Sequence, residues 1–243
     1  MDRAIYLSMS GAQAAMQRQD VLANNLANVS TNGFRAEMAA FRSVPALGDG
    51  ATTRAFALET TLGHSNQSGP VSPTGNPLDV AMRDNAWLAV QALDGTEAYT
   101  RAGAMQVNPE GLLVTVAGLP VQGDGGPITL PPNAIAEIAS DGTVTAKVGN
   151  ARPQTVGKLK LVTPEAPLSR GTDGLFRGRD GELPADGTAR LQSGALEGSN
   201  VSPVEAMVAM ISAARQFEQQ MKMLQGAEQR EQAAAKLLGS SQS

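Results

Sequence analysis

Apolar side chains recur with a helical rhythm at both ends of the chain. Near the N-terminus they are three, four or seven residues apart, which places them on one face of an α-helix; they are Ile5, Met9, Ala12, Met16, Ala23 and Leu26. Near the C-terminus the spacing alternates between three and four, the heptad rhythm of a coiled-coil seam, at Met207, Met210, Ala214, Phe217, Met221 and Leu224. The pattern predicts two terminal helices that pair with each other.

The start of the second helix is marked by Ser202-Pro203-Val204-Glu205. The serine hydroxyl is suited to accept a hydrogen bond from an N–H group of the first turn, and the glutamate is suited to reach back to the cap. Proline is favoured at the first helical position because its fixed φ suits the helix. We therefore expect the helix to begin at Pro203.

Between the two helices the apolar residues form short runs separated by turn signals. Six Asp-Gly pairs lie between residues 94 and 187, and such pairs favour tight hairpins because they tolerate positive φ. The runs predicted as strands are residues 87–91, 112–116, 127–130, 143–148 and 156–162. The fold class is therefore expected to be α+β, with paired terminal helices forming a coiled-coil-like core and a central antiparallel β-rich domain of barrel or sandwich type.

Residues 43–78 show no sustained periodicity and are rich in Gly, Pro, Ser and Thr. We expect them to form an extended connector or loop. Since a connector of this length without contacts is uncommon in a compact protein, we expect it to dock on a partner.

The composition argues against several function classes. Aromatic residues make up only 3% of the 243 residues, which is few for a protein that grips an organic substrate or stacks nucleotide bases. A net charge of -4 argues against nucleic acid or an anionic membrane as partner. The chain has no cysteine, and it shows neither the apolar h-region of a cleaved signal peptide nor an apolar run long enough to span a bilayer. We expect a protein that is not inserted in a membrane.

The candidate chemical groups have simpler interpretations. The only histidine, His64, lies in the expected connector without a nucleophile elbow nearby, and is read as a surface residue. The carboxylates that could form an acid and base pair flank turn signals and are read as solvated turn residues; they are Asp79, Asp84, Asp94 and Glu97. The glycine-rich stretches at 123–126 and 171–187 lack the residues of a phosphate loop or a calcium loop. The sequence predicts no catalytic, cofactor-binding or metal-binding residue.

Both helices carry apolar residues beside their main stripe. These are Val21, Leu22 and Val29 in the first helix, and Val204, Val208 and Ile211 in the second. An apolar face wider than one partner helix covers indicates contacts with neighbouring subunits, as in helical filaments built from heterologous contacts.

Three motifs resemble those of the bacterial flagellar rod and hook proteins. ANNLANVSTNGFRA at 23–36 is similar to the N-terminal signature of that family, and LEGSNVSPVEAMVAMISAARQFEQQMKML at 196–224 to its C-terminal signature. AYTRAGAMQVNPEGLLVTVAGLPVQG at 98–123 resembles the family's β-domain pattern. The resemblance runs from residue 1 to about residue 224, and it departs at Ala86-Trp87, where family members usually place two phenylalanines.

The resemblance implies a structural role without enzymatic activity. Members are exported unfolded through the flagellar type III apparatus, without signal cleavage, and assemble in the periplasm with themselves and other rod proteins into the hollow drive shaft used for motility. It implies an inner core domain formed by residues 1–30 and 203–243, an extended connector at 31–78 and 190–202, and an outer β-rich domain at 79–189. Within the family the compact length and the opening residues look most like the proximal-rod members, with distal-rod members as nearest siblings.

The resemblance also implies residue roles in an assembly interface. Gly33 and Phe34 should turn the chain out of the first helix, and Asn200 and Val201 should do the same before the second. Helical contacts are expected from Met9, Met16, Leu22, Leu26, Met207, Met210, Ile211, Phe217, Met221 and Leu224. Asn24, Asn25 and Asn28 are poor helix formers, and Asn24 and Asn28 share a face from which they are expected to bond laterally to neighbours.

Two other functions stay open from the residues alone. One is a distal-rod subunit. The other is a secreted β-rich adhesin or binding module with the helices as a stalk, which would need a sugar or protein site, whereas Trp87 and Tyr99 are the only aromatic residues that suggest one.

Overall fold

The computed structural model describes residues 3–45, 55–179 and 181–239, and its fold is α+β. The chain divides into two compact units. The helical unit comprises Met1–Ala27, Glu37–Gly63 and Ser202–Ser243, and the β unit comprises Asn28–Ala36 and His64–Val201.

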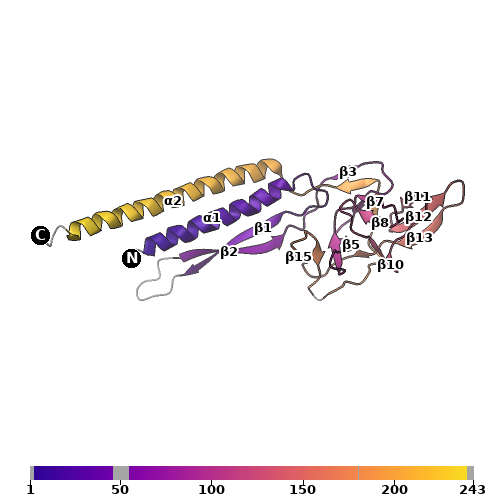
Figure 1. Cartoon of the computed structure of the whole chain (residues 1–243), viewed down its shortest axis with the longest axis horizontal. Coiled ribbons are helices and arrows are strands. Elements are labelled where there is room, and N and C mark those ends of the chain that lie inside the picture. Colours follow the sequence, from indigo (N-terminus) through magenta and orange to yellow (C-terminus); the bar gives the residue numbers. More distant parts are fainter. Residues whose placement is uncertain (1–2, 46–54, 180, 240–243) are drawn as a thin grey trace. The chain divides into compact units, whose positions relative to one another are not determined.

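The helical unit is built on two helices that lie side by side (Figure 1). They are α1, Arg3–Ala27, and α2, Pro203–Gly239. Strands β1, Glu37–Pro45, and β2, Ala55–His64, pair with each other. As predicted, α2 begins at Pro203: the Ser202 Oγ accepts a 3.5 Å hydrogen bond from the Glu205 N–H. In the described part of the chain, neither helix combines the length and apolar character needed to cross a bilayer.

The contact between α1 and α2 is made by small side chains. On α2 the buried positions lie on one heptad position, at Ala206, Ala213 and Ala227, and the half-buried Gln220 occupies the same heptad position between the last two. On α1 the buried positions include Ser8, Ala12 and Ala15. A Cβ added at Gly11 would meet the Gln220 side chain of α2 at 2.9 Å, so this side chain packs directly against the α1 backbone there. Alanine, serine and glycine permit this close approach because they add little bulk between the helix axes.

The buried ridge of α2 is displaced by one residue from the seam predicted from the sequence. Met207 follows the buried Ala206 yet is 52% exposed, and on α1 Met9 and Met16 are 60% and 58% exposed. The heptad rhythm is therefore present, but within one chain the alanines occupy the contact, and the thioether side chains of Met9, Met16 and Met207 are largely exposed. A coiled-coil seam of the predicted residues is not confirmed between the two helices of one chain.

The β unit consists of short antiparallel strands, as predicted. Its largest sheet has the order β14-β5-β6-β16-β15, a second has the order β11-β12-β13, and the pairs β17-β4, β18-β3, β7-β8 and β10-β9 complete it. The strands are β3, Val71–Pro73; β4, Val80–Met82; β5, Trp87–Gln91; β6, Glu97–Thr100; β7, Met105–Val107; β8, Leu113–Thr115; β9, Gln122–Gly123; β10, Gly126–Pro127; β11, Ala134–Ile138; β12, Thr143–Val148; β13, Gln154–Lys158; β14, Leu161–Val162; β15, Ser169–Arg170; β16, Phe176–Arg177; β17, Leu191–Ser193; and β18, Ala195–Glu197.

Strand β5 is covered on both faces and lies at the centre of the core. Leu88 and Val90 belong to the main apolar cluster, whereas Trp87 and Ala89 belong to a smaller cluster with Tyr99, Val162, Leu168 and Phe176. Successive side chains of a strand point to opposite faces, so the run predicted at 87–91 is buried from Trp87 to Val90, and only Gln91 is partly exposed. Among the Asp-Gly pairs predicted as turns, Gly95, Gly142 and Gly174 have positive φ, whereas Gly125 and Gly187 do not adopt positive φ.

The stretch 43–78, expected to be an extended connector, contains paired strands. Part of β1, all of β2 and all of β3 lie in it. Strand β3 pairs with β18, so that Val71 faces Glu197. Local periodicity did not reveal this pairing because the partner strand is far away in the sequence.

Candidate assembly site

An apolar stripe is exposed on the first turns of α2. It consists of Val204, Met207, Val208 and Ile211, which are 70%, 52%, 59% and 55% exposed. Their spacing of three, four and seven residues places them on one face of the helix, and the buried Ala206 and Ala213 lie on the opposite face. Large apolar side chains gathered on one exposed face are typical of a protein interaction surface. We call these four residues the exposed stripe.

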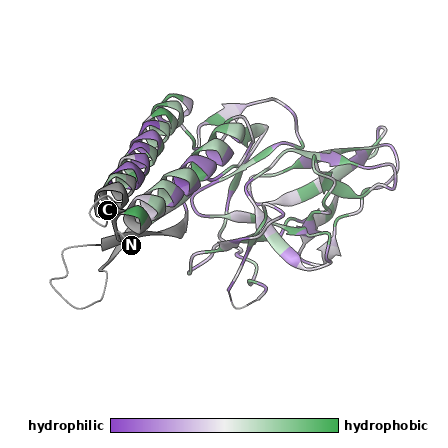
Figure 2. Cartoon of the chain, turned by 60° about the vertical axis from the view of Figure 1, so that its left-hand side comes forward, coloured by the Kyte–Doolittle hydropathy of each residue, from purple (hydrophilic) through white to green (hydrophobic). Residues whose placement is uncertain are grey.

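The other helical residues expected at the interface differ in exposure within the single chain. Met9 and Met16 are exposed on α1. The remaining members are half-buried: Leu22, Leu26, Met210, Phe217, Met221 and Leu224. Figure 2 shows hydrophobic and hydrophilic positions alternating around both helices. The helical unit therefore presents apolar surface that its own second helix does not cover.

The three asparagines at the end of α1 have different surroundings. Asn25 is buried, its amide donates a 2.9 Å bond to the Glu37 carbonyl, and its Oδ1 accepts a 2.9 Å bond from the Glu37 N–H. Asn25 thus pairs with the first residue of β1 as a strand residue would. Asn28 Oδ1 accepts a 3.2 Å bond from the Thr31 hydroxyl, and Asn24 is exposed. Lateral bonding of Asn24 and Asn28 to neighbours stays a prediction.

Gly33 and Phe34 lie in a tight turn in the segment that follows α1. Gly33 has φ of +70°, a conformation that glycine adopts without the penalty of a Cβ. Its N–H donates a 2.8 Å bond to the Glu197 carbonyl. Phe34 is 6% exposed, and the Arg170 guanidinium lies over its ring at 4.6 Å.

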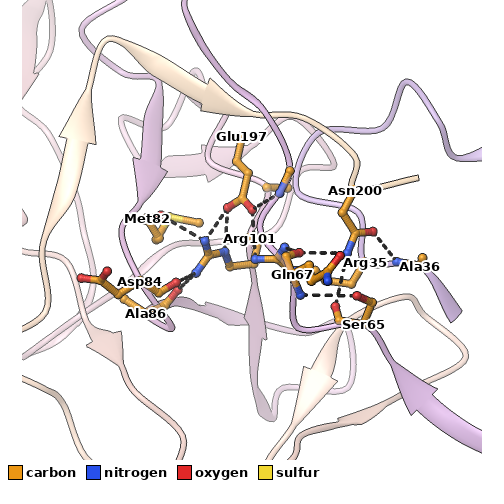
Figure 3. A network of polar contacts seen from close by, with 12 residues as sticks. Arg35, Ala36, Ser65, Gln67, Met82, Asp84, Ala86, Arg101, Glu197 and Asn200 are labelled. Carbon is orange, nitrogen blue, oxygen red and sulfur yellow. Dashed lines mark hydrogen bonds and ion pairs between the residues drawn. The ribbon is translucent and has the colours of Figure 1, made fainter. Parts of the chain in front are cut away.

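Asn200 binds the same segment from the side that leads into α2. Its Oδ1 accepts a 2.7 Å bond from the Ala36 N–H, and its amide donates to the carbonyls of Ser65 and Gln67 at 3.3 and 2.9 Å. The neighbouring Val201 is half-buried. One side chain therefore links three backbone segments, as seen in Figure 3.

A buried charge network lies next to these contacts (Figure 3). Glu197, at the end of β18, is paired with Arg35 at 2.9 Å and with Arg101 at 2.6 Å, and the three side chains are only 1%, 3% and 1% exposed. Arg101 also donates to the carbonyls of Met82, Asp84 and Ala86, and Arg35 donates to the carbonyl of Gln67. We call Arg35, Arg101 and Glu197 the Glu197 network.

The electrostatics of the network depend on this single carboxylate. Burial is the main cause that lowers the pKa of Arg35, and the charge of Arg101 lowers it further, whereas Glu197 raises it. Without the Glu197 carboxylate, two buried positive charges would lie close together with no negative charge to balance them, which is strongly unfavourable. The network therefore has a structural role: the Glu197 carboxylate and the Arg101 guanidinium are bonded within the chain, and of the Arg35 guanidinium only Nε has no hydrogen-bond partner among the described residues.

His64 packs beside this region and is half-buried, which differs from its expected surface position. Its ring lies 4.5 Å from that of Phe176 and 6.2 Å from that of Trp87. Burial lowers the pKa of His64, and the charges of Arg35 and Arg170 lower it further. The neutral ring is thus favoured, as part of an aromatic cluster. Among the described residues no three His, Asp or Glu side chains gather in a way that could hold a metal ion.

The network and its neighbours bring together the three motifs found in the sequence. Arg35, Arg101 and Glu197 come from the N-terminal, β-domain and C-terminal motifs respectively. The segment after α1 and the segment before α2 are joined directly, since the Asn200 N–H also donates to the Phe34 carbonyl at 3.3 Å. Within the β unit, the segment that follows α1 and the segment that precedes α2 are therefore held side by side.

Replacing Gly33 by alanine is expected to destabilise the β unit by about 2–4 kcal/mol, because strain at positive φ adds to overpacking. A Cβ at this position would overlap the backbone of Arg101. Gly95→Ala is the matched control, because Gly95 has φ of +82° but no atom within 4 Å of its added Cβ. Urea unfolding followed by tryptophan fluorescence should show a loss of only about 1 kcal/mol for the control. Equal losses in the two variants would contradict the close approach.

The family comparisons match the same three regions of the chain. The model of the flagella basal body rod protein matches residues 5–35. The D1 domain model of the flagellar hook protein FlgE/F/G matches residues 81–146, and the C-terminal model of the flagellar basal body rod FlgEFG protein matches residues 192–237.

Curated relatives resemble the chain over most of its length. The flagellar basal-body rod protein FlgF of Salmonella typhimurium is 48% identical over 229 residues, covering 90% of this chain and 91% of the relative. FlgF of Escherichia coli is 46% identical with the same coverage. FlgG of Buchnera aphidicola from Schizaphis graminum is 31% identical, covering 88% of this chain and 92% of the relative. With the exposed apolar stripe and the joined motifs, these matches show that the chain belongs to the flagellar basal-body rod protein family.

Proposed function

We propose that the chain is a structural subunit of the proximal part of the flagellar basal-body rod and assembles with neighbouring rod proteins into the drive shaft. The observation that carries this function is the exposed stripe on α2, with Val204 70% and Ile211 55% exposed in a member of a rod protein family. A subunit of this kind acts by binding, without catalysis.

The exposed stripe supports assembly because it has no cover within the described chain. Full burial of one such side chain contributes about 1.5–3 kcal/mol. The stripe faces away from the α1 contact, so a neighbouring subunit is able to cover it without displacing α1. Contacts between two different surfaces of adjacent subunits generate a helical array.

In the assembled rod, we propose that the predicted seam residues form coiled-coil-like contacts between subunits. The methionines of the two helices suit this role, because flexible thioether side chains adapt to irregular neighbouring surfaces. Asn24 and Asn28 are then placed to fix the register of adjacent helices through lateral hydrogen bonds.

The proposal divides the chain by role. Residues 1–30 and 203–243 form the inner core, residues 31–78 and 190–202 connect, and residues 79–189 form the outer domain. The partners are further copies of the chain, other rod proteins and the flagellar type III export apparatus, and the site of action is the basal-body rod in the periplasm. Higher identity to FlgF of Salmonella typhimurium, 48%, than to FlgG of Buchnera aphidicola, 31%, favours the proximal over the distal rod.

Complementation of rod mutants tests this function. The chain should restore swimming in soft agar to a Salmonella typhimurium strain lacking FlgF, whose own protein is 48% identical. The matched control is a strain lacking FlgG, in which the chain should restore no swimming. Restoration in the second strain instead of the first would assign the chain to the distal rod. Failure in the first strain, with the chain stably produced and exported, would contradict the proximal-rod assignment.

A further inference from the structure

The sulfur chemistry of the chain is confined to methionine. The sequence holds ten methionines and no cysteine. Four methionines of the two helices are largely exposed: Met9 60%, Met16 58%, Met207 52% and Met223 59%. In contrast, Met82 and Met105 in the β unit are each 3% exposed. Exposed and buried thioethers are therefore segregated between the two units.

Exposed thioethers are chemically reactive. A peroxide transfers one oxygen atom to the thioether sulfur, which forms a sulfoxide while hydrogen peroxide leaves as water. The sulfur loses two electrons, and the peroxide gains them. Thiolates usually compete for such oxidants, but the chain has no cysteine to intercept them.

The consequence of oxidation depends on where the methionine lies. Met207 belongs to the exposed stripe, and Met9 and Met16 are two turns apart on one face of α1. A sulfoxide is polar and chiral, so it disrupts methionine-rich contact surfaces. Covering it in an apolar contact requires removing water from its oxygen without a matched donor.

We propose that Met9, Met16, Met207 and Met223 are oxidation sites of the free subunit, and that their conversion to sulfoxides by peroxide-class oxidants prevents its incorporation into the rod. This inference rests on the proposed function. Oxidation acts before assembly, when the four side chains are accessible, and reduction of the sulfoxides restores the apolar surface.

Peptide mapping tests the chemistry directly. The purified full chain is treated with hydrogen peroxide and digested at intervals, and the sulfoxide fraction of each methionine is measured by mass spectrometry. The four methionines should oxidise roughly tenfold faster than Met82 and Met105, because exposure controls the reaction. Comparable rates at the exposed and buried sites would overturn the proposal. This test does not depend on rod assembly.

Swimming of complemented cells tests the consequence. Glutamine resembles a methionine sulfoxide in length and polarity, so a variant with M9Q, M16Q, M207Q and M223Q should lose swimming. The matched variant with leucine at the same four positions should swim, because it keeps the apolar surface. M38Q is a further control, since Met38 is 42% exposed on β1 and not on either helix. Equal swimming of the glutamine and leucine variants would overturn the proposal, whereas failure of the unmodified chain would count against the proposed function.

A peroxide pulse links the two results. The pulse has to act on subunits that are not yet assembled, and cells that merely regrow sheared flagella do not need new rods. The pulse is therefore applied to a strain lacking FlgF while production of the chain is being induced. The leucine variant should give at least about threefold more newly swimming cells than the unmodified chain after the pulse, and equal numbers without it. Equal inhibition of the two chains by the pulse would show that these methionines are not the sensitive sites.

Discussion

Replacing Glu197 by glutamine should destabilise the β unit by about 3–5 kcal/mol, since removal of one partner leaves buried charges uncompensated. Glu197 is 1% exposed and is the ion-pair partner of both Arg35 and Arg101. Glutamine keeps nearly the same shape but lacks the charge, so the loss reports electrostatics and not a cavity. A loss of this size would approach the whole stability of many domains.

The only tryptophan, Trp87, is 2% exposed within the β unit, so its fluorescence reports the unfolding of that unit in urea. Glu110→Gln is the matched control, because Glu110 is exposed in the loop before β8, and it should change stability by less than about 0.5 kcal/mol. A Glu197→Gln protein within 1 kcal/mol of the parent, by the same measurement, would mean that the backbone carbonyls bonded to Arg101 and to Arg35 suffice to hold the two guanidinium groups.

Elements with local signals could be predicted from the sequence. The start of α2 follows from Ser202, Pro203 and Glu205, which lie within four consecutive residues, and β5 and β12 coincide with the runs at 87–91 and 143–148. In each case the side chains that decide the structure are neighbours in the sequence. The positive φ of Gly95 and Gly142 follows from Asp-Gly chemistry for the same reason.

Contacts between distant residues could not be predicted in this way. Glu197 and Arg101 are 96 residues apart, and each looked like an ordinary charged residue until the fold brought them together. Their presence in two of the three recognised motifs was the only available signal. The same limit applies to β3, whose partner β18 lies near the other end of the β unit.

The helix contact shows a third kind of limit. Hydrophobicity alone selected the methionines as the seam, whereas close approach of α1 and α2 requires small residues such as Ala206 and Ala213. The displaced seam has a functional consequence: Met9, Met16 and Met207 are left largely exposed within one chain, where a neighbouring subunit is able to cover them.

Replacing Ile211 by aspartate should abolish swimming while leaving the subunit folded. Ile211 is 55% exposed at the end of the exposed stripe, so in the free chain the new carboxylate stays hydrated and costs only about 0.5 kcal/mol of helix propensity. In a covered stripe the carboxylate would lose its water without a partner. A penalty of about 3 kcal/mol or more then weakens the contact by about a hundredfold.

Gln216→Asp is the matched control, since Gln216 is an exposed polar residue of α2 outside the stripe, and it introduces the same residue into the same helix. Circular dichroism and urea unfolding should give closely similar results for the two variants. Soft-agar swimming of the complemented strain should be retained by Gln216→Asp and lost by Ile211→Asp. Normal swimming of Ile211→Asp would show that the stripe remains in water in the rod, and the assembly surface would then have to lie on Met9 and Met16 of α1, where the same substitution is the next to make.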